Sequence, residues 1–164
     1  MGSGKTDFAL LLAELRSRVS DVTVATNVES VVEKDEYICR FDELDEWVTS
    51  DGEKLFIFDE ASSHASGYGS DASEVTGKLR QLLRSFRKNR ASLLIVGHTG
   101  KDVHPDVRRL ANDIIRKESK AEARIYDHVD DDGRVEDVKM RLSGIEQTAW
   151  SYDTREMSEW HWWS

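Results

Sequence analysis

The sequence has little cysteine: Cys39 is the only one in 164 residues. A single thiol excludes a disulfide framework and a thiolate zinc site within one chain, and it fits a reducing compartment. We therefore expect a cytoplasmic protein. The sequence also lacks any apolar run near the roughly 20 residues that a membrane helix needs, so we expect no membrane span. The length suits one domain with a hydrophobic core.

The sequence is also short of positive charge, with a formal net charge of −9. A surplus of acid argues against nucleic-acid binding by the whole surface, although a local basic patch remains possible. High acid content with arginine favoured over lysine resembles the composition of proteins from salt-loving microbes. This likeness is one of composition alone and indicates no mechanism.

The apolar pattern alternates between strand and helix periodicity. A first helix follows residue 5, with Phe8, Leu11, Leu12 and Leu15 at helical spacing. Further helices are expected at 42–53, 71–90 and 105–111, and strands at 21–26, 36–41, 54–60 and 91–99. Segments 113–119, 122–129 and 134–142 alternate like antiparallel strands, with Asp-Gly at 132–133 for a hairpin. This order predicts an α/β fold, a parallel sheet flanked by helices with antiparallel C-terminal strands.

The first residues carry a phosphate-binding pattern. Residues 2–6 read GSGKT and match the last part of G-x-x-x-x-G-K-[ST]. In that pattern glycines allow close approach to phosphate, the lysine reaches the terminal phosphates and the hydroxyl holds Mg²⁺. The candidate nucleotide-binding residues are thus Gly2, Ser3, Gly4, Lys5 and Thr6. The alternative is a Gly/Ser-rich start before a helix.

A carboxylate pair ends the most apolar strand. "LFIF" at 55–58 is followed by Asp59 and Glu60. Asp59 suits Mg²⁺ binding together with Thr6, and Glu60 suits activation of the attacking water. A solvated strand end is the alternative for such a pair alone. Combined with GSGKT some fifty residues earlier, the pair favours a nucleotide hydrolase that uses ATP and Mg²⁺.

The combined pattern resembles RecA-like P-loop ATPases with an additional catalytic glutamate. Within that class it resembles the FtsK/HerA-type DNA-pumping ATPases and their Zot-like relatives, on GSGKT, "VATN" (24–27), "LFIFDEA" (55–61) and "LLIVGHTGKDVHPDVRRLA" (93–111). The resemblance implies that the strand at 92–97 lies between the loop-feeding strand and the 54–58 strand. It also implies that His98 or Thr99 senses the γ-phosphate, although His98 departs from the amide common there and a capping role stays open. Asn27 either touches the site or only makes a turn.

The first half of the phosphate loop, and the strand that would feed it, do not appear in the sequence. We expect that the chain is truncated within this motif, or else a degenerate ATPase, and that an N-terminally extended form binds ATP better. The predicted organisation is an ATPase domain at 1–149, incomplete at its start, followed by a Trp-rich tail at 150–164.

Residues 78–90, "KLRQLLRSFRKNR", contain six basic residues and no acid. Arg80, Arg84 and Arg87 share one helix face. Three roles stay open: an arginine finger in a neighbouring subunit, a DNA contact, or a solvated face. A homo-oligomeric ring is expected from the resemblance.

The tail holds Trp160, Trp162 and Trp163, which we expect to pack on the core rather than form a contact surface. His161 has no metal partner at a suitable sequence spacing, so no ligand role is assigned to it. The resemblance implies an ATP-driven DNA translocation or packaging motor, for a virus or mobile element of a haloarchaeal host. The alternatives are a non-hydrolysing ATP-binding assembly module and, more weakly, a small-molecule kinase.

Overall fold

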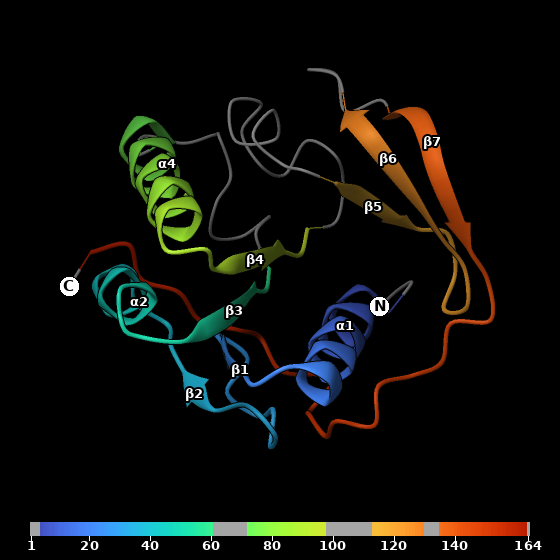
Figure 1. The fold of residues 1–164 in the computed structure, drawn as a ribbon, viewed down its shortest axis with the longest axis horizontal. Helices are drawn as coiled ribbons and strands as arrows, with labels where there is room; N and C mark the ends of the chain where they lie inside the picture. Colours follow the sequence, from blue (N-terminus) through green and yellow to red (C-terminus); the bar gives the residue numbers. More distant parts are fainter. Residues whose placement is uncertain (1–3, 61–71, 98–112, 130–134, 164) are drawn as a thin grey trace.

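The computed structural model describes residues 4–60, 72–97, 113–129 and 135–163 (Figure 1). In chain order the elements are α1 (Lys5–Val19), β1 (Val22–Thr26), β2 (Glu36–Tyr37), α2 (Phe41–Val48), β3 (Glu53–Phe58), α4 (Ala72–Lys88), β4 (Ser92–Ile95), β5 (Ile114–Lys117), β6 (Ala123–Val129) and β7 (Val135–Leu142). The helix predicted at 105–111 and the hairpin turn at 132–133 lie outside the described residues.

The first four strands form a parallel sheet in the order β2-β1-β3-β4. The central strand β3 pairs with β1 on one side and with β4 on the other. The expected neighbourhood of the 92–97 and 54–58 strands is therefore present, and the mixed α/β class is confirmed. Within the part of the chain that the structure describes, no strand pairs with the outer edge of β4.

Helices cover both faces of this sheet, with α1 on one side and α2 and α4 on the other (Figure 1). The side chains of β3 alternate between the two layers, as a pleated strand requires. Phe56 and Phe58 pack towards α2 and α4, whereas Leu55 and Ile57 pack towards α1. Burial on both faces explains why this strand reads as an unbroken apolar run.

The buried face of α1 differs from the predicted one. The prediction holds for Phe8, which is buried, but Leu11 and Leu12 are only partly buried and Leu15 is 46% exposed. Ala9, Leu10 and Ala13 are buried in their place. Small side chains at positions 9 and 13, about one turn apart, let the helix lie close to the sheet.

The longer helix α4 follows its prediction closely. Leu79, Leu82 and Phe86 are buried and Leu83 is partly buried against the same cluster. The arginines of this helix lie on other faces, so its amphipathic pattern separates the core from a cationic surface.

Strand β2 is shorter than predicted, with only Glu36 and Tyr37 paired to β1. The Ile38 N–H donates to the Thr26 carbonyl at 3.1 Å, and beyond it the chain leaves the sheet. Cys39 and Phe41 instead make backbone hydrogen bonds with His161 of the tail. The tail thus replaces β1 as the backbone partner of the segment after β2.

The last three strands form a separate antiparallel sheet in the order β5-β6-β7. This part agrees with the three antiparallel strands predicted from alternation and with the pairing of the last two. Figure 1 shows this sheet beside α1, away from α2 and α4.

Two of the three tail tryptophans pack on the core, as expected, whereas the prediction is wrong for Trp163, which is 47% exposed. Trp160 is 6% exposed and Trp162 is 7% exposed. Their rings lie 4.9 Å and 6.0 Å from the ring of Phe58, measured between centroids. In the described residues after β7 the chain forms no helix, and its one bridge joins His161 to Arg40. The tail is therefore a structural part of the parallel-sheet layer.

Candidate functional site

The start of α1 and the end of β3 meet at the carboxyl edge of the parallel sheet. The Thr6 hydroxyl donates a 2.8 Å hydrogen bond to Asp59 Oδ1. Asp59 is only 6% exposed. The two sequence motifs predict that these side chains bind one magnesium ion, although they lie 53 positions apart in the chain. The structure brings them into direct contact.

The backbone at Gly4 turns the chain into α1. Gly4 has φ 72° and ψ 39°, in the left-handed region that suits glycine. Its carbonyl accepts the first helical bond, from the Phe8 N–H at 2.9 Å. The N–H groups of a first helical turn and the helix dipole favour an anion at this end. Local geometry therefore fits a phosphate group in front of Lys5 and Thr6.

Asp59 and Glu60 lie in a cavity of about 780 Å³ together with Gly4, Lys5 and Thr6. This size falls within the usual range for small-molecule sites, roughly 300–1,000 Å³. Glu60 has φ 59°, a conformation that non-glycine residues adopt at a cost and that recurs at functional sites. This left-handed backbone conformation lies just after the end of β3, beside the cavity.

Asn27 holds the backbone of Asp59 in place. It is fully buried, its Oδ1 accepts from the Asp59 N–H at 2.7 Å, and its Nδ2 donates to the Asp59 carbonyl at 3.1 Å. The same Nδ2 reaches the carbonyl of Glu159 at 3.2 Å. Asn27 is not among the residues that line the cavity. It is a positioning residue that links β1, β3 and the tail.

The cavity is also lined by residues that the sequence analysis did not identify. They come from the antiparallel sheet and the tail, and they include Lys117, Lys120, Tyr152, Asp153, Arg155 and Glu156. Among the residues that the structure describes, four cationic and five carboxylate side chains line the cavity: Lys5, Lys117, Lys120 and Arg155, with Asp7, Asp59, Glu60, Asp153 and Glu156. This mixture suits a polyanion that is bound together with a divalent cation. The cationic side chains can contact the anion, and the carboxylates can contact the cation.

Two of these residues have perturbed acidity. Burial lowers the pKa of Lys117, whose Nζ lies 5.2 Å from the centre of the Phe8 ring. Burial, and then the nearby carboxylate of Asp7, raise the pKa of Tyr152 to about 12. The Tyr152 hydroxyl donates to Asp7 Oδ1 at 3.3 Å. Both side chains connect α1 to the later part of the chain, a contact that no sequence spacing could indicate.

Four predicted site residues, Gly2, Ser3, His98 and Thr99, lie outside the described residues. The positions just before the last two, Val96 and Gly97, line the cavity. The carboxyl end of β4 therefore points to the same place as that of β3.

Two groups of arginines lie away from this cavity. Arg80, Arg84 and Arg87 of α4, together with Leu83, line a smaller hollow of about 320 Å³. A second group was not anticipated: in the antiparallel sheet Arg124 lies in register with Arg116 on one side and Arg141 on the other. Like charges in register repel one another, and the Arg124 Nε lies 3.8 Å from a Glu118 carboxylate oxygen. The chain thus has two local cationic surfaces despite its acidic total.

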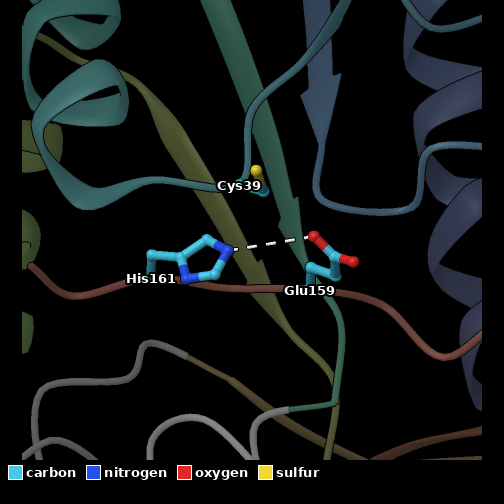
Figure 2. A group of neighbouring side chains, drawn as sticks. All are labelled: Cys39, Glu159 and His161. Atoms are coloured by element: carbon cyan, nitrogen blue, oxygen red, sulfur yellow. Dashed lines mark ion pairs between the residues drawn. The ribbon is translucent and has the colours of Figure 1, made fainter. Parts of the chain in front are cut away.

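No metal partner of His161 stands at a suitable sequence spacing, but the fold brings two other ligand-type side chains close to it. The side-chain ligand atoms of Cys39, Glu159 and His161 all lie within 4.8 Å of one another. Figure 2 shows His161 and Glu159 on the tail, with Cys39 on the segment after β2. One cysteine also does not exclude a metal site that uses a single thiolate. Residues far apart in the sequence converge here because the tail returns to the sheet.

Among the described residues, no helix combines the length and apolar character required to cross a membrane. No protein-family model, curated protein or solved structure matches this chain.

Proposed function

We propose that the chain binds ATP with Mg²⁺ in the 780 Å³ cavity and hydrolyses it, as a RecA-like P-loop motor that acts on DNA. The observation that carries the proposal is the 2.8 Å hydrogen bond between Thr6 and the buried Asp59. It joins the two sequence motifs on which the resemblance to DNA-pumping ATPases depends. The Thr6 hydroxyl and the Asp59 carboxylate are hard oxygen ligands, the type that Mg²⁺ prefers.

Each residue has a distinct role in this proposal. Lys5 and the N-terminus of α1 bind the phosphates, and Thr6 with Asp59 would hold Mg²⁺, which supplies charge neutralisation at the phosphoryl group. Glu60 orients a water molecule and accepts its proton as the water attacks. Asn27 fixes the Asp59 backbone, so that Asp59 and Glu60 can serve these two different roles.

Replacement of Glu60 tests the hydrolytic step. We expect Glu60→Gln to keep ATP affinity and to lower phosphate release by about 100-fold or more, the scale of a lost general base. Glu46→Gln, at an exposed position on α2, is the matched control and should leave both unchanged. Binding by calorimetry and phosphate release should be measured on the same preparations. Normal turnover in Glu60→Gln would remove this residue from its role, and ATP binding without turnover in the parent chain would favour the non-hydrolysing assembly module.

The DNA part of the proposal depends on the arginine face of α4. Arg80, Arg84 and Arg87 present three charges on one side of a helix whose opposite side is buried. Such a face fits the regularly spaced phosphates of a nucleic acid. We expect a triple Arg→Gln variant of this face to lose DNA stimulation of phosphate release while basal turnover persists.

The in-register arginines of the antiparallel sheet provide the matched comparison. A triple Arg→Gln variant at 116, 124 and 141 removes the same number of charges from another surface. It should retain DNA stimulation at every salt concentration tested. Loss of stimulation only in this second variant would show that the DNA contact lies on the antiparallel sheet and not on α4, and no stimulation in the parent chain would contradict a DNA motor.

A further inference from the structure

The tail at 158–163 is an extended segment whose side chains alternate between core and solvent. Ser158, Trp160 and Trp162 are buried, whereas Glu159 and His161 are exposed. In an extended chain, residues two apart point to the same side. The burial of the two tryptophans against Phe58 and its neighbours therefore places Glu159 and His161 together on the outer side.

Backbone hydrogen bonds fix this outer side against the segment that carries Cys39. The His161 N–H donates to the Cys39 carbonyl at 2.8 Å, and the His161 carbonyl accepts from the Phe41 N–H at 2.9 Å. Ring contact between Phe41 and Trp162, with centroids 5.9 Å apart, supports the same pairing from the core side. The relative position of the thiol and the imidazole is thus set by backbone pairing and by packing.

The separations of the three ligand atoms are close to those of a metal centre. His161 Nε2 and a Glu159 carboxylate oxygen lie 3.8 Å apart, and no pair that includes Cys39 Sγ exceeds 4.8 Å. In a tetrahedral zinc site, bond lengths of about 2.0–2.3 Å place ligand atoms roughly 3.3–3.8 Å apart. Glu159 and His161 have side chains 70% and 56% exposed, so small rotations can close the remaining difference without disturbing the core.

We propose that Cys39, Glu159 and His161 form a binding site for one Zn²⁺ ion that clamps the tail to the segment after β2 (Figure 2). A thiolate, an imidazole and a carboxylate form a borderline-soft set that suits zinc and not Mg²⁺, so the site is chemically distinct from the oxygen ligands at Thr6 and Asp59. Three protein ligands leave a fourth position for water. On binding, the Cys39 thiol forms its bond to zinc and gives its proton to the buffer.

The clamp would act on a segment that already contacts the nucleotide side of the sheet. The Glu159 carbonyl accepts from Asn27, and Asn27 holds Asp59. The Ser158 hydroxyl also donates to the Asp59 carbonyl at 3.4 Å. Zinc is therefore expected to stiffen the tail where it crosses the ends of β1 and β3, and it does not need a bound nucleotide to do so.

The test uses the full chain, freed of metal by a chelator and kept reduced with a phosphine. Titration with ZnCl₂ in a calorimeter should give one site per chain, and CoCl₂ should give the thiolate-to-cobalt absorption of a bound cysteine. Cys39→Ser and His161→Ala should each lower zinc affinity by more than about 100-fold, because a direct ligand contributes more than the roughly 10–100-fold of a residue that only supports one. Glu159→Gln keeps an amide oxygen, so its loss should be smaller, at least about 10-fold.

His128→Ala, on β6 of the other sheet, is the matched histidine control and should bind zinc like the parent chain. The tryptophan fluorescence of each variant under native conditions reports whether the tail still packs on the core. It therefore distinguishes the loss of a metal ligand from the loss of folded structure. Lys5→Ala should leave zinc affinity unchanged, so the outcome here is independent of the proposed ATPase activity. Zinc binding that is absent in the parent chain, or equal in the parent and the folded His161→Ala variant, would overturn the proposal.

Discussion

The two sheets of this protein are stabilised in different ways. In the parallel sheet, Phe56, Ile57 and Phe58 of β3 are at most 1% exposed, with helices on both sides. In the antiparallel sheet, Val138 and Met140 of β7 are 44% and 54% exposed. Both faces of the parallel sheet are covered by core side chains, and we call this sheet with its helices the platform. The antiparallel sheet has apolar side chains exposed to solvent. The parallel sheet therefore holds the backbone of the candidate site in place, while the antiparallel sheet contributes individual side chains to the edge of the cavity.

The largest expected effect comes from removing an aromatic ring of the platform. Phe58→Ala should destabilise the fold by about 3–5 kcal/mol, because the ring contacts Trp160, Trp162 and Phe56 and cannot be replaced by solvent. Met140→Ala is the matched truncation in the other sheet and should cost at most about 0.5 kcal/mol. Urea denaturation followed by tryptophan fluorescence measures both. Equal losses in the two variants would remove the contrast between the sheets.

The next effect concerns the buried amide that joins β1, β3 and the tail. Asn27→Ala leaves the Asp59 N–H without its acceptor, and an unsatisfied buried group costs about 1–3 kcal/mol. Because Asp59 also loses its fixed backbone, ATP affinity should fall in the same variant. Asn89→Ala provides the control at the end of α4, where the amide bonds only to the neighbouring Ser85 carbonyl. Unchanged ATP affinity in a folded Asn27→Ala variant would show that the Asp59 backbone does not need this support.

Several features of the platform could be predicted because they depend on local pattern. The unbroken apolar run of β3 indicated burial on both faces, and the apolar positions of α4 gave its buried stripe. The buried face of α1 was predicted only at Phe8, because Ala9 and Ala13 contribute by being small, which leucine spacing does not reveal.

The site itself was predictable only in part. Lys5, Thr6, Asp59 and Glu60 belong to sequence motifs, and the structure brings them to one cavity. Residues from the antiparallel sheet and the tail, such as Lys117 and Arg155, reach the cavity through long-range packing that leaves no periodic signal. Cys39 and His161 are also brought together by long-range packing, so the sequence gives no sign that they are neighbours.

A smaller effect tests the contact between α1 and the segment before the tail. Hydrogen bonding by the Thr148 hydroxyl, and then by the Ala149 N–H with the charge of Arg18, lowers the pKa of Glu14 despite opposing burial. A carboxyl whose folded pKa lies below its unfolded value of about 4.5 stabilises the fold above that pH. This contribution is lost as the pH falls through the folded pKa. Glu14→Gln should therefore be less stable than the parent chain at pH 7, by about 1 kcal/mol, and the difference should shrink below pH 4.5.

Denaturation midpoints collected from neutral to acidic pH would check this dependence. Glu33→Gln, which affects an exposed contact to the Ser151 N–H, is a suitable carboxylate control at neutral pH. A Glu14→Gln difference that grows as the pH falls would contradict the direction of the Glu14 pKa.

The smallest effect is expected at the surface of the antiparallel sheet. Lys139 pairs with Asp113 at 2.7 Å, with side chains 42% and 51% exposed. Exposed ion pairs contribute about 0–1 kcal/mol and are screened by salt. Lys139→Met should thus change stability by less than about 0.5 kcal/mol at physiological salt. A larger loss in urea denaturation would mean that this sheet depends on its charges more than the comparison allows.

The most direct test of the account is where Mn²⁺·ATP binds, since Mn²⁺ can replace Mg²⁺ and broadens nearby amide signals in an NMR spectrum. With ATP present, the amides of Thr6, Asp59 and Glu60 should broaden first, while those of Val138 and Met140 in β7 should keep their intensity. A titration with Mn²⁺ alone identifies any signals that respond to the metal without nucleotide. If saturating Mn²⁺·ATP leaves Thr6 and Asp59 sharp, the cavity between α1 and β3 is not a nucleotide site.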